Sequence, residues 1–404
     1  MSSDKKKNKG ARRKRLWVFA SIAFVVVLGG FYYFYFVATT AAIEHAENFL
    51  FRRMTVTQLS SQSEFRHFFV TNRRQVTDDG PVEDSFGNER TDNLVFGSFD
   101  VTIEPSLGLG MIINPTEWFQ NEEIQIDRIV KFERDDAIET LRDYVDRSPK
   151  RSLLIVIHGF RERFDSALRK TAFVASVLDI DTPVLVFDWP GDQGSSLRGY
   201  RAARDVATQS GTDLAAFLEV LIREVRPDKV SMIANSMGGQ VVVDAFSLLY
   251  ENPGLADEDT ELDHVVLTAP DVDHAEFDAR FRDEIRALAN NLTVYVSSND
   301  RALLVSRWIN RGTRLGESTF RPDQLEEAVS VSRLIEPGSD LITLVDVTPV
   351  NRTRNFHNFS LETPEFFDDL FLRLSLDESP PPNRLVYGIK TPDGVDYWVL
   401  TRGR

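Results

Sequence analysis

An apolar run that stops at a serine between small residues constrains this chain more than any other feature. Residues 229–234 are mostly apolar, and Ser236 follows them one residue later. A nucleophile elbow is a strand-to-helix turn so tight that its serine is strained, and it needs small residues two positions before and after the serine. Ala234 and Gly238 meet this need, and the apolar spacing of 240–250 predicts a buried helix after the turn. The pattern favours a nucleophilic serine, with a simple helix-capping serine as the alternative.

A second apolar run, residues 152–158, is followed by Gly159 and Phe160. In an acyl-transfer enzyme, a backbone N–H group in the loop after such a strand faces the negatively charged oxygen that forms on the substrate carbonyl. The residue after the nucleophile supplies a second N–H group. We therefore expect an oxyanion hole formed by the backbone N–H groups of Phe160 and Met237.

The general base can be chosen by elimination, because the chain contains only six histidines. In this architecture the base follows both the nucleophile and the acid along the chain. Three histidines precede Ser236, His264 begins an apolar run, and His274 follows the serine too soon for a strand-borne acid to lie between them. His357, which lies after the predicted strand 341–347, is therefore the predicted base. The alternative is an ordinary histidine of a surface loop.

The acid that orients the base is expected where a strand ends. Asp300 comes just after the apolar run 292–298, and this position makes it the preferred acid. Asp271 and Asp273 follow the preceding run, 264–269, and some hydrolases carry the acid one strand earlier. Both therefore stay open as alternatives, and a carboxylate without the catalytic role is expected to cap a helix or a turn.

Apolar runs with strand and helix periodicity alternate over most of the chain. Strands are expected at 68–71, 94–103, 152–158, 183–188, 229–234, 264–269, 292–298 and 341–347, and helices near 136–145, 162–178, 197–226, 239–250, 275–289, 301–310 and 366–374. Such alternation predicts a mostly parallel, doubly wound sheet with helices on both faces. With a serine turn in the middle of the sheet, this is the α/β-hydrolase fold.

Several short motifs also resemble those of a known family. They are Phe69-Val70-Thr71-Asn72-Arg73, His158-Gly159-Phe160, Trp189-Pro190, Asn235-Ser236-Met237-Gly238, Ala269-Pro270-Asp271, Asn299-Asp300-Arg301 and Arg314-Leu315-Gly316. Together they resemble the bacterial α/β-hydrolase family catalogued as a domain of unknown function, DUF900, over residues 65–375. The resemblance implies a serine hydrolase fold with Ser236, Asp300 and His357 in the triad positions. It implies no particular substrate.

The first forty residues predict a membrane anchor. Residues 1–15 contain eight Lys or Arg residues against Asp4, a net charge of +7, and residues 16–40 carry no charge. At about 1.5 Å per residue, a helix of this length crosses a hydrocarbon core of roughly 30 Å. Basic residues stay in the cytoplasm, so we expect the rest of the chain on the far side, which in a bacterium is the periplasmic side of the inner membrane. A cleaved signal peptide is the alternative, although its apolar region is usually only about 7–15 residues long.

Charge and cysteine content exclude several classes of function. The whole chain carries −15 and residues 1–15 carry +7, so the remainder carries −22. This acidity argues against nucleic-acid binding by the exported part. Because the chain contains no cysteine, disulfides and thiolate chemistry are excluded. No metal-binding or phosphate-binding motif is found, and no cofactor is expected.

The remaining segments complete the predicted domain organisation. We expect a juxtamembrane stalk at 41–65, the hydrolase domain at 66–376, a stiff proline-rich linker at 377–383 and a β-hairpin at 384–404. The hairpin is predicted from the turn sequence Pro392-Asp393-Gly394 between two apolar runs. It is expected to cap an edge of the sheet or to bind a protein partner.

Three functions fit these patterns. The first is a membrane-anchored serine hydrolase that cleaves carboxylic esters, with lipid or envelope-borne esters as substrates. An amidase or peptidase that uses the same residues is a weaker variant of it. The third is a membrane-tethered scaffold whose hydrolase fold has lost activity, favoured by the charged loop residues Arg161-Glu162-Arg163 and by the added C-terminal tail.

Overall fold

The fold is taken from a computed structural model. The described residues are 54–60, 63–77, 82, 85–103, 124–251, 261–281, 284, 287–310, 312–317, 342–353, 357–375, 386–390 and 396–401. All of them belong to one compact unit, Phe51–Arg404. Three of the predicted segments lie outside the described residues: the basic segment 1–15, the anchor 16–40 and the proline-rich linker 377–383. In the part of the chain that the structure describes, no helix combines the length and the apolar character that crossing a bilayer requires.

The described strands form one eleven-stranded sheet, in the order β10-β11-β9-β8-β7-β6-β4-β5-β1-β2-β3. Their bounds are β1 Glu64–Gln75, β2 Phe86–Ile103, β3 Ile124–Phe132, β4 Ser152–Ile157, β5 Val184–Asp188, β6 Lys229–Asn235, β7 Glu261–Thr268, β8 Ala289–Val296, β9 Ile342–Asp346, β10 Val386–Lys390 and β11 Asp396–Leu400. Neighbours from β11 through β1 pair in parallel, and only β1–β2, β2–β3 and β10–β11 are antiparallel. The predicted mostly parallel sheet is confirmed.

Helices connect the parallel strands. The described ones are α4 Arg134–Arg147, α5 Phe164–Leu178, α6 Leu197–Val220 with its continuation η3 Leu221–Val225, α7 Gly238–Tyr250, α8 His274–Glu276 with its continuation η4 Phe277–Phe281, α10 Arg301–Asn310, η5 Leu315–Glu317, α12 Phe359–Glu362 and α13 Pro364–Ser375. The helix expected at 275–289 is helical at its described residues 275–281, 284, 287 and 288. Its last position, Ala289, belongs to β8 instead, because it pairs with Leu262 of β7.

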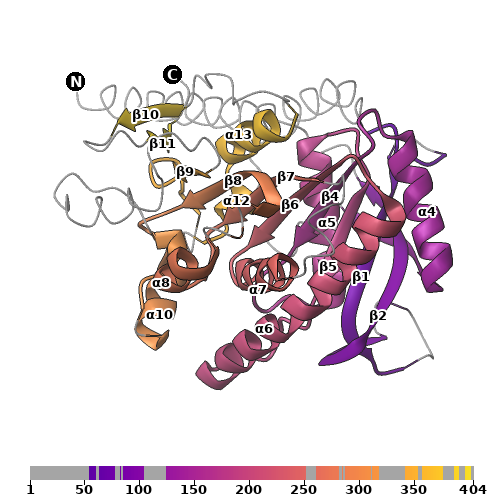
Figure 1. Cartoon of the computed structure of the whole chain (residues 1–404), viewed down its shortest axis with the longest axis horizontal. Helices are drawn as coiled ribbons and strands as arrows, with labels where there is room; N and C mark the ends of the chain where they lie inside the picture. The colour runs from indigo at the N-terminus through magenta and orange to yellow at the C-terminus, as the bar shows by residue number, and fades with distance from the viewer. Residues whose placement is uncertain are drawn as a thin grey trace, which may run out of the picture. The chain divides into compact units, whose positions relative to one another are not determined.

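The two faces of the sheet follow from the alternation of side chains along each strand. Leu153, Ile155 and Ile157 of β4 lie in one core with buried residues of α4, α6 and α7. Tyr295 of β8 points to the other face, where its ring packs on Phe366 of α13 at a centroid distance of 4.8 Å. Figure 1 shows α6 beside α7 over the parallel strands. Helices therefore cover both faces, as the alternating pattern predicts.

The folded unit begins earlier than the predicted boundary at residue 66. Met54 is only 1% exposed, and Phe65 is fully buried at the start of β1. The backbone N–H groups of Thr55 and Val56 donate to Asp181 Oδ1 at 2.8 and 2.9 Å. The end of the expected stalk is thus part of the domain, because its apolar residues find a core to bury in.

The C-terminal hairpin joins the main sheet. β10 and β11 pair in antiparallel fashion, with Gly388 opposite Trp398. β11 also pairs in parallel with β9, where Trp398 lies opposite Val345. The hairpin therefore extends the sheet at one edge, and β10 is the outermost strand on that side.

One buried histidine is expected to lower the stability of the fold. Neither ring nitrogen of His67 on β1 has a hydrogen-bond partner among the described residues, and burial lowers its pKa to about 4. Replacing it with Leu should raise the free energy of unfolding by about 1–3 kcal/mol, because an unpaired buried polar group is removed. His264 is a matched control: burial also lowers its pKa to about 4, but its Nε2 lies 2.8 Å from Thr293 Oγ1.

The effect of His67 on the free energy of unfolding depends on pH. Because the folded pKa of His67 lies below its ordinary value of 6.5, protonation of the unfolded chain costs stability as the pH falls from 6.5 toward about 4. Above pH 6.5 only the unpaired ring nitrogens lower the stability. Urea unfolding between pH 7 and pH 4 should show a smaller loss of stability in His67→Leu than in the unmodified chain. A gain of the same size in His264→Leu would contradict the role given to the missing hydrogen bonds.

Candidate active site

Ser236 lies in the turn between β6 and α7, at the end of the strand in the middle of the sheet. Its φ angle is +53°, in the left-handed region that is strained for any residue with a side chain. The turn is held from β7, because the Ser236 N–H donates to the Thr268 carbonyl at 2.9 Å and the Ser236 carbonyl accepts from the Asp271 N–H at 3.0 Å. A Cβ atom on Gly238 would lie 2.5 Å from the His158 carbonyl oxygen, which explains the need for glycine there.

His357 connects Ser236 to Asp300. Its Nε2 lies 2.9 Å from Ser236 Oγ, and its Nδ1 lies 2.7 Å from Asp300 Oδ2. The other carboxylate oxygen of Asp300 accepts the N–H groups of Ala302 and Leu303, each at 3.0 Å, so this side chain also caps α10. The cap and the near-complete burial of Asp300 hold its carboxylate in one orientation. The three side chains form a continuous line of hydrogen bonds from carboxylate to hydroxyl.

The environment of His357 favours its protonated form. Burial lowers its pKa, but the hydrogen bond and the charge of Asp300 outweigh this effect, and Asp271 adds to them. The pKa of His357 is therefore raised above its ordinary value of 6.5. A raised pKa makes the imidazole a stronger proton acceptor, which is the property that a general base needs.

The two expected oxyanion donors border Ser236. A Cβ atom on Gly159 would lie 3.0 Å from the Ser236 Cβ, so the loop that contains Phe160 runs directly beside the serine. Met237 is the N-cap residue of α7. Within the described residues, neither the Phe160 nor the Met237 N–H group has a hydrogen-bond partner. Two unpaired N–H groups and a helix N-terminus are what a developing negative charge requires.

Asp271 and Asp273 have other partners. Asp271 is 4% exposed and accepts hydrogen bonds from Tyr200 at 2.7 Å and from Ser306 at 2.5 Å. Asp273 caps α8 by accepting the N–H groups of Ala275 and Glu276. The structure thus brings Asp300 to His357. Of the two alternatives, Asp271 positions Tyr200 and Ser306, and Asp273 caps a helix. Within the described ranges, no group of three or more His, Asp or Glu side chains is arranged to hold a metal ion.

A buried ion pair behind the oxyanion loop has no counterpart in the residues chosen from sequence. Arg73 and Asp188 are fully buried, with Arg73 Nε 2.7 Å from Asp188 Oδ2. Asp188 also accepts from Thr71 at 2.6 Å, and its other oxygen lies 3.0 Å from His158 Nε2. Arg73 Nη2 donates to the carbonyl of Glu162 at 2.8 Å. The pair therefore links β1 and β5 to both ends of the loop that contains Phe160.

Charge balance keeps the Asp188 carboxylate ionised. Burial opposes the charge of Asp188, but Arg73 and His158 outweigh it and lower the Asp188 pKa to about 2. In the sequence Arg73 is only part of a motif that resembles a known family, and no local feature predicts a buried ion pair. The partner of Arg73 lies 115 residues further along the chain.

Removing Arg73 should destabilise the protein strongly. Arg73→Met leaves Asp188 buried without its cation, and such a loss costs about 3–5 kcal/mol in the free energy of unfolding. The neighbouring Arg74 is a matched control, because its ion pair with Glu89 is exposed and an exposed pair contributes at most about 1 kcal/mol. Urea unfolding of Arg73→Met and Arg74→Met measures the difference. Equal losses in the two variants would show that the buried pair is not a support of the fold.

With the geometry described, comparison with known proteins identifies the family. The family model described as "Alpha/beta hydrolase of unknown function (DUF900)" matches residues 133–370, more than half of the chain. The chain belongs to the DUF900 family. The matched region begins after β3, so it is narrower than the 65–375 expected from motifs, and it contains Ser236, Asp300 and His357. The α/β-hydrolase fold predicted for this DUF900 chain is confirmed. No curated protein matches it.

Among solved structures, the esterase Pf2001 of Pyrococcus furiosus is similar at a TM-score of 0.35 and 13% identity, over 70% of this chain and 87% of the esterase. A propionate-bound esterase, Est2, of the planctomycete Thermogutta terrifontis is similar at a TM-score of 0.32 and 12% identity, over 57% of this chain and 86% of the esterase. At such scores the likeness carries no argument about activity or substrate.

Proposed function

We propose that this DUF900 protein is a serine hydrolase that cleaves carboxylic esters, with Ser236 as nucleophile, His357 as general base and Asp300 as the acid that orients the base. The observation that supports the proposal is the line of hydrogen bonds from Asp300 through His357 to a strained serine. A strained left-handed serine costs stability, and such strain persists where it serves a site. The same distances in a protein without this activity would have no evident use.

The proposed reaction proceeds in two steps. As Ser236 Oγ attacks the ester carbonyl, His357 Nε2 takes its proton, and the N–H groups of Phe160 and Met237 stabilise the oxyanion. His357 then gives the proton to the departing alcohol, which leaves an acyl-serine. A water molecule then attacks the acyl carbon while His357 Nε2 takes one of its protons. As the acyl–Oγ bond breaks, His357 returns that proton to Ser236 Oγ, and the carboxylic acid and free Ser236 are released.

The proposed location is the outer side of a membrane. Residues 16–40 would anchor the chain, with residues 1–15 in the cytoplasm and the hydrolase domain on the far side, which in a bacterium is the periplasm. Esters of membrane lipids or of other envelope components are then accessible substrates. The edge strand β10 would be the place for a protein partner, because an edge strand has unpaired backbone groups.

The charged loop that favoured an inactive scaffold has a structural use. The Glu162 carboxylate accepts from Ser166 at 2.6 Å and is paired with Lys170. Burial raises the pKa of Glu162, but Lys170 outweighs it and lowers the pKa overall. The charge of this loop thus serves to fix its shape beside the oxyanion donors. An amidase or peptidase would need the same groups, and no further observation favours it.

A fluorophosphonate probe and an ester series test the proposal. The full chain should be labelled covalently by the probe and should hydrolyse p-nitrophenyl esters, tested from acetate to palmitate. Preference for short chains would indicate a small-ester esterase, and preference for long chains would indicate lipid substrates. Absence of both labelling and hydrolysis would refute the proposed serine hydrolase activity and favour the tethered scaffold.

A further inference from the structure

Helix α10 presents an apolar face to solvent. Leu304, Val305 and Trp308 are 41%, 58% and 79% exposed. Together with exposed Arg301 they recur at the i, i+3, i+4 and i+7 spacing that forms one continuous stripe along a helix. We call these four residues the α10 face. Leu303 and Ser306 point the opposite way and are buried, so the helix is held on the domain with its apolar stripe outward.

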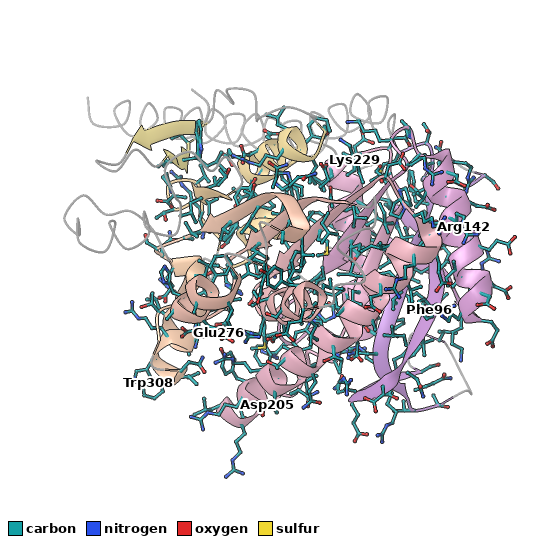
Figure 2. The ribbon with its side chains drawn as sticks, in the orientation of Figure 1. Phe96, Arg142, Asp205, Lys229, Glu276 and Trp308 are labelled. Atoms are coloured by element: carbon teal, nitrogen blue, oxygen red, sulfur yellow. The ribbon has the colours of Figure 1, made fainter. Side chains whose placement is uncertain are left out.

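The first turns of α6 lie beside the buried side of α10. Arg204 Nη1 donates to Asn310 Oδ1 at 2.8 Å, and the Tyr200 hydroxyl lies 2.8 Å from Ser306 Oγ. Leu197 at the start of α6 is 42% exposed. In Figure 2, Trp308 and Asp205 lie on the same side of the domain. Lys229, the first residue of β6, lies on the opposite side.

Positive charge accompanies the apolar side chains. α10 contains Arg301 and Arg307 and no acidic residue, with Arg307 Nη1 3.9 Å from Glu317 Oε1. Residues 197–204 of α6 contain three arginines, and Asp205 follows them. The chain after residue 15 carries −22, so this concentration of arginine runs against the charge of the domain. Exposed aliphatic side chains and a tryptophan on one helix face, with arginines on it and beside it, are the combination that binds at the interface of an anionic lipid bilayer.

Both helices border the active site. Asp300 caps α10, and Tyr200 of α6 packs edge-on against Phe160 of the oxyanion loop at a ring distance of 5.6 Å. We propose that the α10 face, with the start of α6, binds an anionic lipid surface and holds the active site against it. The consequence that the esters to be cleaved lie at that surface rests on the proposed hydrolase function. The binding step itself does not.

The absence of cysteine allows a direct test. Val305→Cys in the full chain, held by its anchor in a phosphatidylcholine nanodisc, is labelled with an environment-sensitive fluorophore and mixed with vesicles. We expect the emission to shift to shorter wavelength with vesicles of equal parts phosphatidylglycerol and phosphatidylcholine. With phosphatidylcholine alone it should not shift, and high salt should reverse the shift. Val76→Cys, at an exposed residue of the same type on another part of the domain, is the matched control and should not respond.

Charge variants test the role of the arginines. Arg301→Gln with Arg307→Gln should weaken binding to the anionic vesicles about 30-fold, about fivefold for each arginine. No shift with either vesicle, or equal shifts in Val305→Cys and Val76→Cys, would overturn the proposal. Emission that is already shifted before vesicles are added would mean that a second copy or another segment of this chain covers the face. Dilution distinguishes these two cases, because it removes a second copy but not a segment of the same chain. Either case overturns the proposal. Because no substrate is present, the result does not depend on ester hydrolysis.

Discussion

Replacing Ser236 with Ala should abolish both fluorophosphonate labelling and ester hydrolysis, with kcat reduced by about 10⁴-fold or more. The hydroxyl is the only group of this residue that can form the acyl bond, and its hydrogen bond to His357 Nε2 at 2.9 Å is the path by which its proton leaves. The residual rate would come from the oxyanion donors and from substrate binding.

The matched control for this variant is Ser231→Ala on the same strand. Ser231 is the third residue of β6, whereas Ser236 follows the end of that strand. Thermal unfolding of both variants should show that each still folds. Removal of the strained side chain is not expected to harm the fold. Labelling that persists in Ser236→Ala at the level of the unmodified protein would show that another residue is the nucleophile.

Replacing Asp300 with Asn should reduce kcat by about 10⁴-fold, because an amide can no longer hold the imidazole in the tautomer that accepts the serine proton. Asn keeps the shape of the side chain and can still cap α10, so the effect is expected in catalysis more than in folding. This prediction also separates the acids, since Asp271→Asn should cause a much smaller loss. A larger loss of kcat in Asp271→Asn than in Asp300→Asn would show that Asp271 is the acid that orients His357.

The pH dependence of the same variant gives an independent readout. His357 must be neutral to accept a proton, so kcat/KM should fall as the pH drops through its pKa, which lies above 6.5. Asp300 is the main cause that raises this pKa. In Asp300→Asn the fall of the remaining kcat/KM at acidic pH should therefore move to lower pH. If this fall stays at the same pH, Asp300 does not raise the pKa of His357.

Local patterns were sufficient for the parallel sheet and for the choice of Ser236, Asp300 and His357. Each of these residues follows an apolar strand, and the carboxyl ends of parallel strands meet at one edge of a sheet. The structure brings the three side chains within hydrogen-bond distance. Whether they perform the chemistry is the question that the variants answer.

The buried ion pair depends on register and could not be read from local sequence. Thr71 on β1 lies opposite Asp188 on β5 in the parallel pairing. This register alone brings Arg73 to its partner, and nothing in either segment signals it. The early boundary of the domain was missed for a similar reason. Residues 54–60 form no long helix or strand, and their burial and their contacts with Asp181 and β1 show that they belong to the fold.

The position of β11 affects how the protein is made. β9 lies between β8 and β11, so one of its two neighbours is the last of the described strands. During synthesis β9 emerges before β11 and has an open edge until residues 396–400 are available. An unpaired edge of a parallel sheet is a site where nascent chains associate with one another. Pairing with residues 396–400 closes this open edge of the strand that leads to His357, a task separate from any role in catalysis.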